Sequence, residues 1–241
     1  MPGGVSAGCA CRDFADATGE PGSSISFSAA LGDASATLGN RAVLVERLQL
    51  PRPPRWLKQV HGAHVSRSDT DVVADAAISD GAPLVILTAD CLPILLARDD
   101  GAEIAAIHAG WRGLAAGVIE ATLDALSSSG HRYRAWIGPA IGMDAFEIGP
   151  EVREALLDAD PEAIDAFKPG RDDRWHADLA ALARRRLETR GLQVSGGEWC
   201  TLSHPTRFHS FRRDGANSGR MASVIWREST VESGFLNQTR T

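Results

Sequence analysis

The residues best suited to chemistry in this chain lie in a turn over residues 107–113. An apolar, strand-like run enters this turn and a helical pattern over 114–126 leaves it, so His108 ends a strand and Arg112 starts a helix. Two glycines in the turn let the backbone bend sharply and come close to a ligand. The free N–H groups of a helix start, together with the planar guanidinium, favour a phosphate or carboxylate. The structural alternative is a tight turn in which Arg112 only caps the helix.

A second candidate, Cys91, lies in the apolar run that precedes this turn. An Asp-Gly pair at 100–101 joins the run to the strand before the turn, which predicts a hairpin. A loop centred between residues 99 and 100 sets Cys91 opposite His108, with Cβ atoms roughly 5 Å apart. A thiolate and an imidazole at that separation can share a metal ion. A register shifted by two residues puts His108 opposite Pro93 instead, still near Cys91.

Two histidines and a carboxylate add further candidates. Residues 56–61 predict a strand that ends at Gly62. It carries His61, and His64 follows closely. Both are candidate ligands, although a lone histidine at a strand end is more often a structural residue. Asp90, beside Cys91, is a candidate for orienting a ligand or acting as a base. Burial as a turn residue explains that aspartate equally well.

Length and composition are those of an ordinary globular protein. With 241 residues, 44% of them hydrophobic and 23% charged, the chain can bury a substantial core. A net charge of -6 and a pI near 5.6 argue against a general nucleic-acid binder. No apolar run approaches the roughly 20 residues of a transmembrane helix, and the first residues lack the features of a signal peptide. We therefore expect a cytoplasmic protein, and its four cysteines fit that compartment.

The rest of the pattern alternates short strands with helices. We interpret residues 1–23 as a ragged lead, 24–28 as an edge strand and 229–241 as a loose tail. Cys9-Ala10-Cys11 is interpreted as a surface pair, because no second ligand pair lies nearby. Further strands are predicted over 72–78, 134–137 and 221–226, and helices over about 39–48, 151–158 and 179–190, the last closed by Gly191. With no repeat or long linker, we predict a single α/β (mixed α+β) domain over 1–241, with central β-structure flanked by helices.

Five short motifs follow one another along the chain. They are Gln59-Val60-His61-Gly62, Thr88-Ala89-Asp90-Cys91-Leu92-Pro93, His108-Ala109-Gly110-Trp111-Arg112-Gly113, Ile137-Gly138-Pro139-Ala140-Ile141-Gly142 and Phe211-Arg212-Arg213-Asp214. In this order, over about residues 24–226, they resemble the laccase-domain family, once called multicopper polyphenol oxidases. That family is now interpreted as zinc-dependent purine nucleoside phosphorylases with adenosine deaminase activity. The resemblance implies a single α/β domain and the zinc ligands His61, Cys91 and His108.

The implied ligand set agrees with elementary metal chemistry. Two imidazoles and one thiolate leave a fourth zinc position open, as in a catalytic site, for water or a polarised substrate. Asp90 and Arg112 are our candidate catalytic residues, and Arg41, Gln59 and Arg112 our candidates for binding substrate. The expected partners are phosphate and a small nucleoside such as adenosine, inosine, guanosine or methylthioadenosine, with neither nucleic acid nor membrane. Copper is the less favoured metal.

One stretch departs from the family pattern. Family members usually carry Ser-Leu-Asn-Leu-Gly and then a histidine near the N-terminus, whereas this chain has Ser26 in place of the asparagine and Ala30 in place of the histidine. The Asn40-Arg41 pair that follows is kept. The change therefore bears on purine specificity more than on metal binding.

Three other functions stay open. Some relatives are described as peptidoglycan-editing hydrolases. A copper polyphenol oxidase wants several clustered histidines, and here His131, His176 and His204 lie in unrelated polar segments. A non-catalytic binding module would need a closed metal site, with His209 or Cys200 as the fourth ligand.

Overall fold

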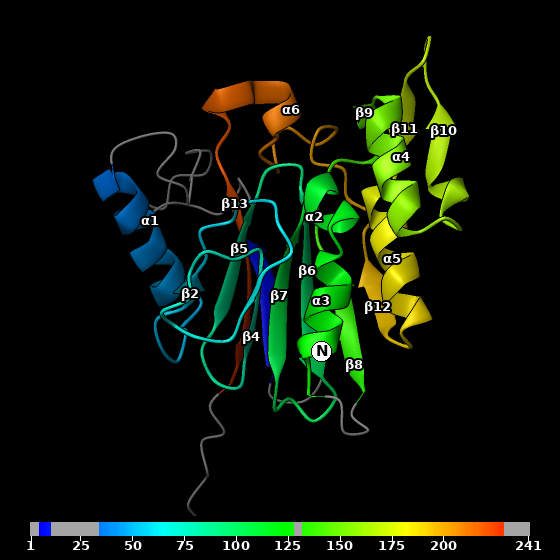
Figure 1. Ribbon diagram of the computed structural model, residues 1–241. Coiled ribbons are helices and arrows are strands. Elements are labelled where there is room, and N and C mark those ends of the chain that lie inside the picture. Colours follow the sequence, from blue (N-terminus) through cyan, green and yellow to red (C-terminus); the bar gives the residue numbers. More distant parts are fainter. Residues whose placement is uncertain (1–4, 11–33, 128–131, 229–241) are drawn as a thin grey trace, which may run out of the picture.

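Two β-sheets lie at the centre of the fold, and helices flank the β-structure (Figure 1). The computed structural model describes residues 5–10, 34–127 and 132–228. A four-stranded sheet has the order β1-β13-β5-β2 and a six-stranded sheet has the order β12-β8-β6-β7-β4-β3. The strands of the first are β1 (Val5–Ala10), β13 (Met221–Arg227), β5 (Leu84–Thr88) and β2 (Arg55–Trp56). Those of the second are β12 (Gln193–Gly196), β8 (Tyr133–Ile137), β6 (Leu92–Arg98), β7 (Ile104–Ala109), β4 (Ala76–Ser79) and β3 (Val65–Ser66).

The strand pattern explains why the two sheets pack face to face. Successive side chains of a strand point to opposite faces, and β6 is apolar at nearly every position. Leu95 of β6 lies in one buried cluster with Leu84 and Ile86 of β5, between the sheets. Ile94 and Leu96 of β6 belong instead to the cluster that the helices cover. Both faces of this strand are thus removed from water.

The helices form the outer layers. Helix α1 (Ala34–Arg47) packs through Leu44 against Val85 and Val224 of the four-stranded sheet. On the opposite side α2 (Trp111–Ala115), α3 (Val118–Ala125) and α5 (Leu179–Thr189) cover the six-stranded sheet (Figure 1). The remaining elements are α4 (Pro150–Ala159), α6 (Phe211–Asp214), a small sheet of β9 (Glu147–Ile148), β10 (Phe167–Pro169) and β11 (Trp175–Ala177), and 3₁₀ turns at Met143–Ala145, Ile164–Ala166 and Gly215–Asn217. The predicted α/β fold with central β-structure and flanking helices is confirmed. None of the helices in the described ranges combines the length and the apolar character needed to cross a bilayer.

The hairpin of β6 and β7 forms in the second of the two registers that the sequence allows. His108 pairs with Pro93 and not with Cys91. The reason lies in the turn, where Gly101 takes a positive φ of 73° and its N–H bonds to the carbonyl of Arg98 at 2.8 Å. This places the centre of the loop between residues 100 and 101, one position later than expected. Cys91 consequently precedes β6 instead of lying within the ladder.

The helix predicted over 114–126 is wrong in two respects. It begins earlier, at Trp111, and it is divided into α2 and α3 at Gly117, whose φ of 81° is left-handed and incompatible with a continuing helix. With only five residues, α2 carries a small dipole, so any anion at the turn depends on side chains more than on the helix start.

Other boundaries also differ from expectation. The strand predicted over 56–61 is limited to β2, and the chain beyond it is irregular, with His61 at a φ of 61°. The N-terminal residues 5–10, expected as part of a ragged lead, pair with β13 along their whole length as β1. The segment 159–175, to which the sequence analysis assigned no strand, contains β10 and the start of β11. The strand predicted over 24–28 lies outside the described residues.

Candidate metal and substrate site

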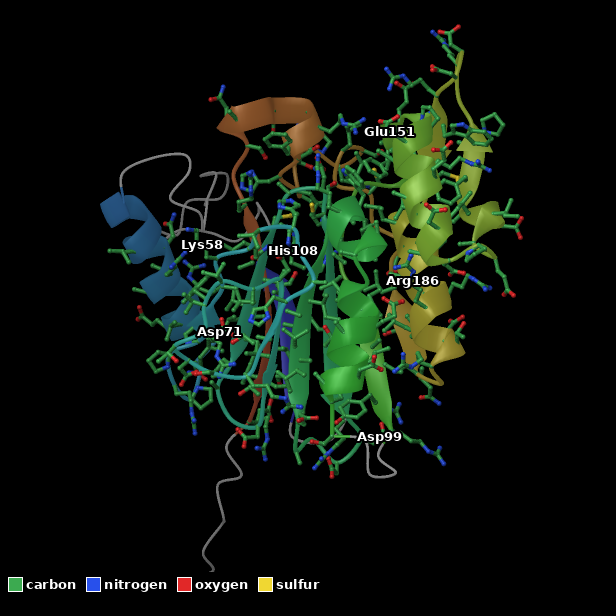
Figure 2. All side chains as sticks on the ribbon, viewed as in Figure 1. Lys58, Asp71, Asp99, His108, Glu151 and Arg186 are labelled. Atoms are coloured by element: carbon green, nitrogen blue, oxygen red, sulfur yellow. The ribbon has the colours of Figure 1, made fainter. Side chains whose placement is uncertain are left out.

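Three side chains from separate segments converge at one end of the six-stranded sheet. His61, Cys91 and His108 offer ligand atoms that all lie within 4.8 Å of one another. The Sγ of Cys91 is 3.7 Å from Nε2 of His61, and the two imidazole rings meet edge to face with centroids 4.7 Å apart. Figure 2 shows His108 in the part of the molecule nearer to α6, whereas Asp99 of the hairpin loop lies at the opposite end.

His108 is held by a carboxylate that the sequence analysis did not select. Its Nδ1 is 2.7 Å from Oδ1 of Asp75, a residue with no exposed surface. This contact leaves Nε2 for Cys91. Burial lowers the pKa of His108, but the hydrogen bonds to Asp75 and Cys91 raise it more, to about 9. Burial raises the pKa of Asp75, and hydrogen bonds from His108, Gly62 and His61 lower it below its ordinary value.

Cys91 is prepared as a thiolate by its neighbours. Burial raises the pKa of the thiol. Hydrogen bonds from His108 and His61, together with their charges, lower it by more, so that the pKa is about 6. A thiolate is the form of cysteine that binds metals. Gly110 makes room for this arrangement, because a Cβ there would lie 3.0 Å from Cys91 Sγ and 3.0 Å from Cδ2 of His61.

The donor types fit a zinc ion, and one donor pair already has nearly the spacing of zinc ligands. Ligand atoms held about 2.0–2.3 Å from a tetrahedral zinc lie roughly 3.5 Å apart, close to the 3.7 Å between Cys91 Sγ and His61 Nε2. Nitrogen and sulfur donors are also the types that zinc prefers. Within the part of the chain that the structure describes, this is the one group of three or more histidine, cysteine or acidic residues close enough to hold an ion. Neither Cys200 nor His209 joins it, so the described residues would offer three ligands to a metal ion and leave a fourth position open.

The three residues line a cavity of about 890 Å³. Among the residues that the structure describes, this wall contains five cationic side chains and a single carboxylate, that of Asp90, in a chain whose net charge is -6. Each of its four arginines stacks near an aromatic ring of the same wall. The pairs are Arg41 with Trp56 at 4.2 Å, Arg112 with Trp111 at 4.4 Å, Arg212 with Phe146 at 5.5 Å and Arg220 with Phe211 at 5.6 Å from the ring centroid. The fifth cation is Lys58, labelled in Figure 2.

The carboxylate of Asp90 is already fully engaged. It accepts hydrogen bonds from Oγ1 of Thr201 at 2.5 Å, Oγ of Ser210 at 3.0 Å and the N–H of Arg212 at 2.6 Å. These contacts tie the segment that carries α6 to the residue next to Cys91. Of the two roles left open for Asp90, this geometry favours the structural one over that of a base.

The candidate substrate-binding residues all lie on the cavity wall, in different settings. Gln59 bonds through its amide to both the N–H and the carbonyl of Leu87, at 2.8 and 2.7 Å, and so continues the edge of β5. Arg112 is exposed at the start of α2. Arg41, on α1, is partly buried, and burial lowers its pKa. His64, by contrast, lies outside the wall and pairs with Asp71 at the surface, 2.6 Å away.

Asp75 and Arg220 are among the residues of the site that the sequence analysis did not select. Asp75 interrupts the apolar run 72–78, and a buried charge inside such a run needs a partner. The sequence therefore contained a signal that could have identified this residue. Arg220 precedes β13 by one residue and is half-buried against Phe211, and burial lowers the pKa of its guanidinium. Nothing local distinguishes Arg220 from other arginines, because only the folding of β13 beside β5 brings it to the cavity.

Comparison with known proteins places this geometry in a described family. The model of a family described as multi-copper polyphenol oxidoreductase laccase matches residues 7–228. A protein of Xylella fastidiosa (strain Temecula1) named purine nucleoside phosphorylase is 48% identical over 201 residues, covering 78% of this chain and 77% of that protein. Purine nucleoside phosphorylase YfiH of Escherichia coli (strain K12) is 42% identical over 234 residues, covering 94% and 95% of the two chains. The crystal structure of Neisseria meningitidis protein NMB0706 superposes with a TM-score of 0.86 at 36% identity, covering 95% and 96%.

Proposed function

This chain belongs to the multi-copper polyphenol oxidoreductase laccase family, and we propose that it is an enzyme, a zinc-dependent purine nucleoside phosphorylase. The resemblance drawn from the five sequence motifs is thereby confirmed at the level of the family. Two relatives at 48% and 42% identity carry the name purine nucleoside phosphorylase. The proposal extends their activity to this chain.

The observation that carries the proposal is the composition of the cavity wall. Five cations against one engaged carboxylate favour an anion such as phosphate, in a protein that is acidic as a whole. Four aromatic rings on the same wall offer flat apolar surfaces on which a purine can stack. The volume of about 890 Å³ lies within the range of roughly 300–1,000 Å³ typical of small-molecule sites.

We assign roles to the residues of the wall as follows. His61, Cys91 and His108 hold zinc, which when bound supplies Lewis-acid chemistry to a substrate or a water molecule. Arg112 binds phosphate through its planar donors, and Arg220 faces the same cavity with a second guanidinium. Arg41 and the ring of Trp56 contact the nucleoside.

Phosphorolysis defines what these residues must do. The bond between the anomeric carbon of the sugar and a purine nitrogen breaks, and a phosphate oxygen bonds to that carbon. The proton that the hydrogen phosphate gives up leaves on the purine nitrogen. The guanidinium groups hold the phosphate close to the positive charge that develops on the sugar. A substrate stacked on the aromatic rings of the wall would displace water, which would otherwise hydrolyse the same bond.

A second reaction at this site, adenosine deamination, is favoured by one feature. The described residues offer three protein ligands, so the fourth position is available to a water molecule. A site with three protein ligands is unfavourable to the binding-module alternative, which needs a closed structural metal site with four. It is also unfavourable to an oxidase with several coppers, which needs further histidine clusters. Peptidoglycan-precursor hydrolysis remains the alternative without a specific supporting feature.

The decisive experiment incubates zinc-loaded protein with adenosine, inosine, guanosine and methylthioadenosine, with and without phosphate, and identifies the products. Phosphorolysis yields the free base and the sugar 1-phosphate, and only when phosphate is present. A free sugar in both conditions would mean hydrolysis, and inosine as the sole product of adenosine would mean deamination alone. No product from any nucleoside would refute the proposal. Cytoplasmic location and the absence of nucleic-acid partners stay predictions from the sequence.

A further inference from the structure

Asp75 contacts two of the three proposed zinc ligands at once. Its Oδ1 accepts a hydrogen bond from the backbone N–H of His61 at 2.8 Å and lies 2.7 Å from Nδ1 of His108. Its Oδ2 accepts the N–H of Gly62 at 2.7 Å, and the N–H of Val60 lies 3.2 Å from both oxygens. The residue has no exposed surface, so no solvent competes for these contacts.

The sheet explains how the carboxylate reaches His108. Strands β4 and β7 are antiparallel with Ala76 paired to Ile107, so the next pair outward is Asp75 with His108. The backbone confirms this pairing, because the N–H of His108 donates to the carbonyl of Asp75 at 2.7 Å. Directly opposed residues of antiparallel strands carry their side chains on the same face. The carboxylate and the imidazole therefore meet by sheet geometry.

The loop at 60–62 approaches the same carboxylate from the other side. Three consecutive backbone N–H groups converge on it, an arrangement that binds anions. His61 holds a φ of 61°, a left-handed conformation that a histidine adopts only when its surroundings favour it. The hydrogen bonds to Asp75 stabilise that conformation and so fix the direction of the His61 side chain.

We propose that Asp75 is the positioning residue of the site, setting the tautomer of His108 and the backbone of His61 through one carboxylate. The inference rests on the zinc binding proposed above and adds a requirement to it. The acceptor at Nδ1 keeps the proton on that nitrogen and leaves Nε2 with a lone pair for the metal. Without Asp75, two of the three ligands lose their orientation together.

Replacement by asparagine separates this proposal from simple packing, because the side chain keeps its size but gains a donor. With the new NH₂ facing His108, Nδ1 must accept, and the proton moves to Nε2, where it blocks metal binding. With the NH₂ facing Gly62, two donors oppose each other and the loop that carries His61 is displaced. Either orientation impairs one ligand.

The test compares wild type, Asp75→Asn and a matched control, Glu103→Gln. Glu103 is also a buried carboxylate with several donors, from Tyr133, Ser127 and Arg67, but it lies by the hairpin loop away from the zinc ligands. Zinc affinity is measured by competition with a chromophoric chelator. We expect Asp75→Asn to weaken zinc binding about 10- to 100-fold and Glu103→Gln to leave it unchanged.

A spectroscopic measurement keeps the proposal testable if Asp75→Asn does not fold. In zinc-loaded wild type, ¹H–¹⁵N NMR should show a slowly exchanging proton on Nδ1 of His108 and none on Nε2. A proton on Nε2, or wild-type zinc affinity in folded Asp75→Asn, would overturn the role of Asp75. A wild type that binds no zinc would instead refute the proposed metal site, so the two failures are distinguishable.

Discussion

Gly110→Ala places one methyl group between two proposed zinc ligands. The added Cβ would lie 3.0 Å from Cys91 Sγ, 3.0 Å from Cδ2 of His61 and 3.8 Å from its Nε2. Favourable non-bonded contacts lie at about 3.5–4.0 Å, so the two side chains must withdraw by a few tenths of an ångström. Zinc–ligand distances tolerate only about 0.2 Å of deviation. A methyl group that pushes Cys91 and His61 apart therefore weakens their hold on a shared ion.

The backbone at Gly110 accepts alanine readily, which isolates this effect. Its φ of -72° and ψ of 167° lie in the extended region open to every residue. We therefore expect the metal-free variant to fold, and its zinc affinity to fall by at least the ~10- to 100-fold seen when a ligand's orienting partner is lost. Chelator competition measures the affinity, and thermal unfolding of the metal-free protein checks the fold.

Gly62→Ala is the matched control for this variant. Gly62 is next to His61, but a Cβ there would meet Asp75 Oδ2 at 3.6 Å, an ordinary contact. Its zinc affinity should stay near that of wild type. Equal affinities for wild type and Gly110→Ala would refute the reasoning, because they would mean that the ion sits elsewhere or that the ligands have more freedom than the contacts allow.

Three further outcomes are expected. Arg112→Ala should lower phosphate-limited turnover roughly 10- to 100-fold without changing zinc content, since a charge-assisted hydrogen bond contributes about 1.5–3 kcal/mol. The control is Arg207→Ala, outside the cavity wall, and normal phosphate saturation of Arg112→Ala would mean that this arginine only caps a helix. Leu95 is fully buried between the sheets, so Leu95→Ala should lower the free energy of unfolding by about 2–5 kcal/mol in urea titrations. A smaller loss would mean that the two sheets move together and fill the space left by the side chain. In metal-free protein, the rate of Cys91 alkylation should rise with pH around a midpoint of about 6, because His108 and His61 stabilise the thiolate by more than burial destabilises it. A midpoint near the ordinary 9.0 would contradict that stabilisation, and bound zinc should suppress the reaction.

Local patterns in the sequence were sufficient for much of the fold. The apolar runs that became β6 and β7, and the Asp-Gly pair between them, identify a hairpin without any tertiary information. The helix closed by Gly191 likewise follows from a 3.6-residue period and a residue that tolerates a positive φ, observed at 81°. Such signals are reliable because helix and strand periods, caps and turns depend on neighbours within a few residues.

Local sequence patterns did not predict the division of the helix at Gly117 or the register of the hairpin. Glycine is tolerated inside a helix as well as at its end, so the sequence alone does not say that Gly117 takes a left-handed φ. The two hairpin registers differ by two residues and place the same side chains on the same faces, so the hydrophobic pattern does not choose between them. The turn at Gly101 does.

The sequence by itself determined which chemistry is available: two histidines and a cysteine suited to zinc, and a glycine turn with an arginine beside it. The tertiary structure decided which groups act together. Asp75 meets His108 only because β4 pairs with β7, and Arg220 reaches the cavity only because β13 pairs with β5. The type of donor atom is a property of each residue alone, whereas the orientation and protonation of its side chain depend on neighbours from distant segments of the chain.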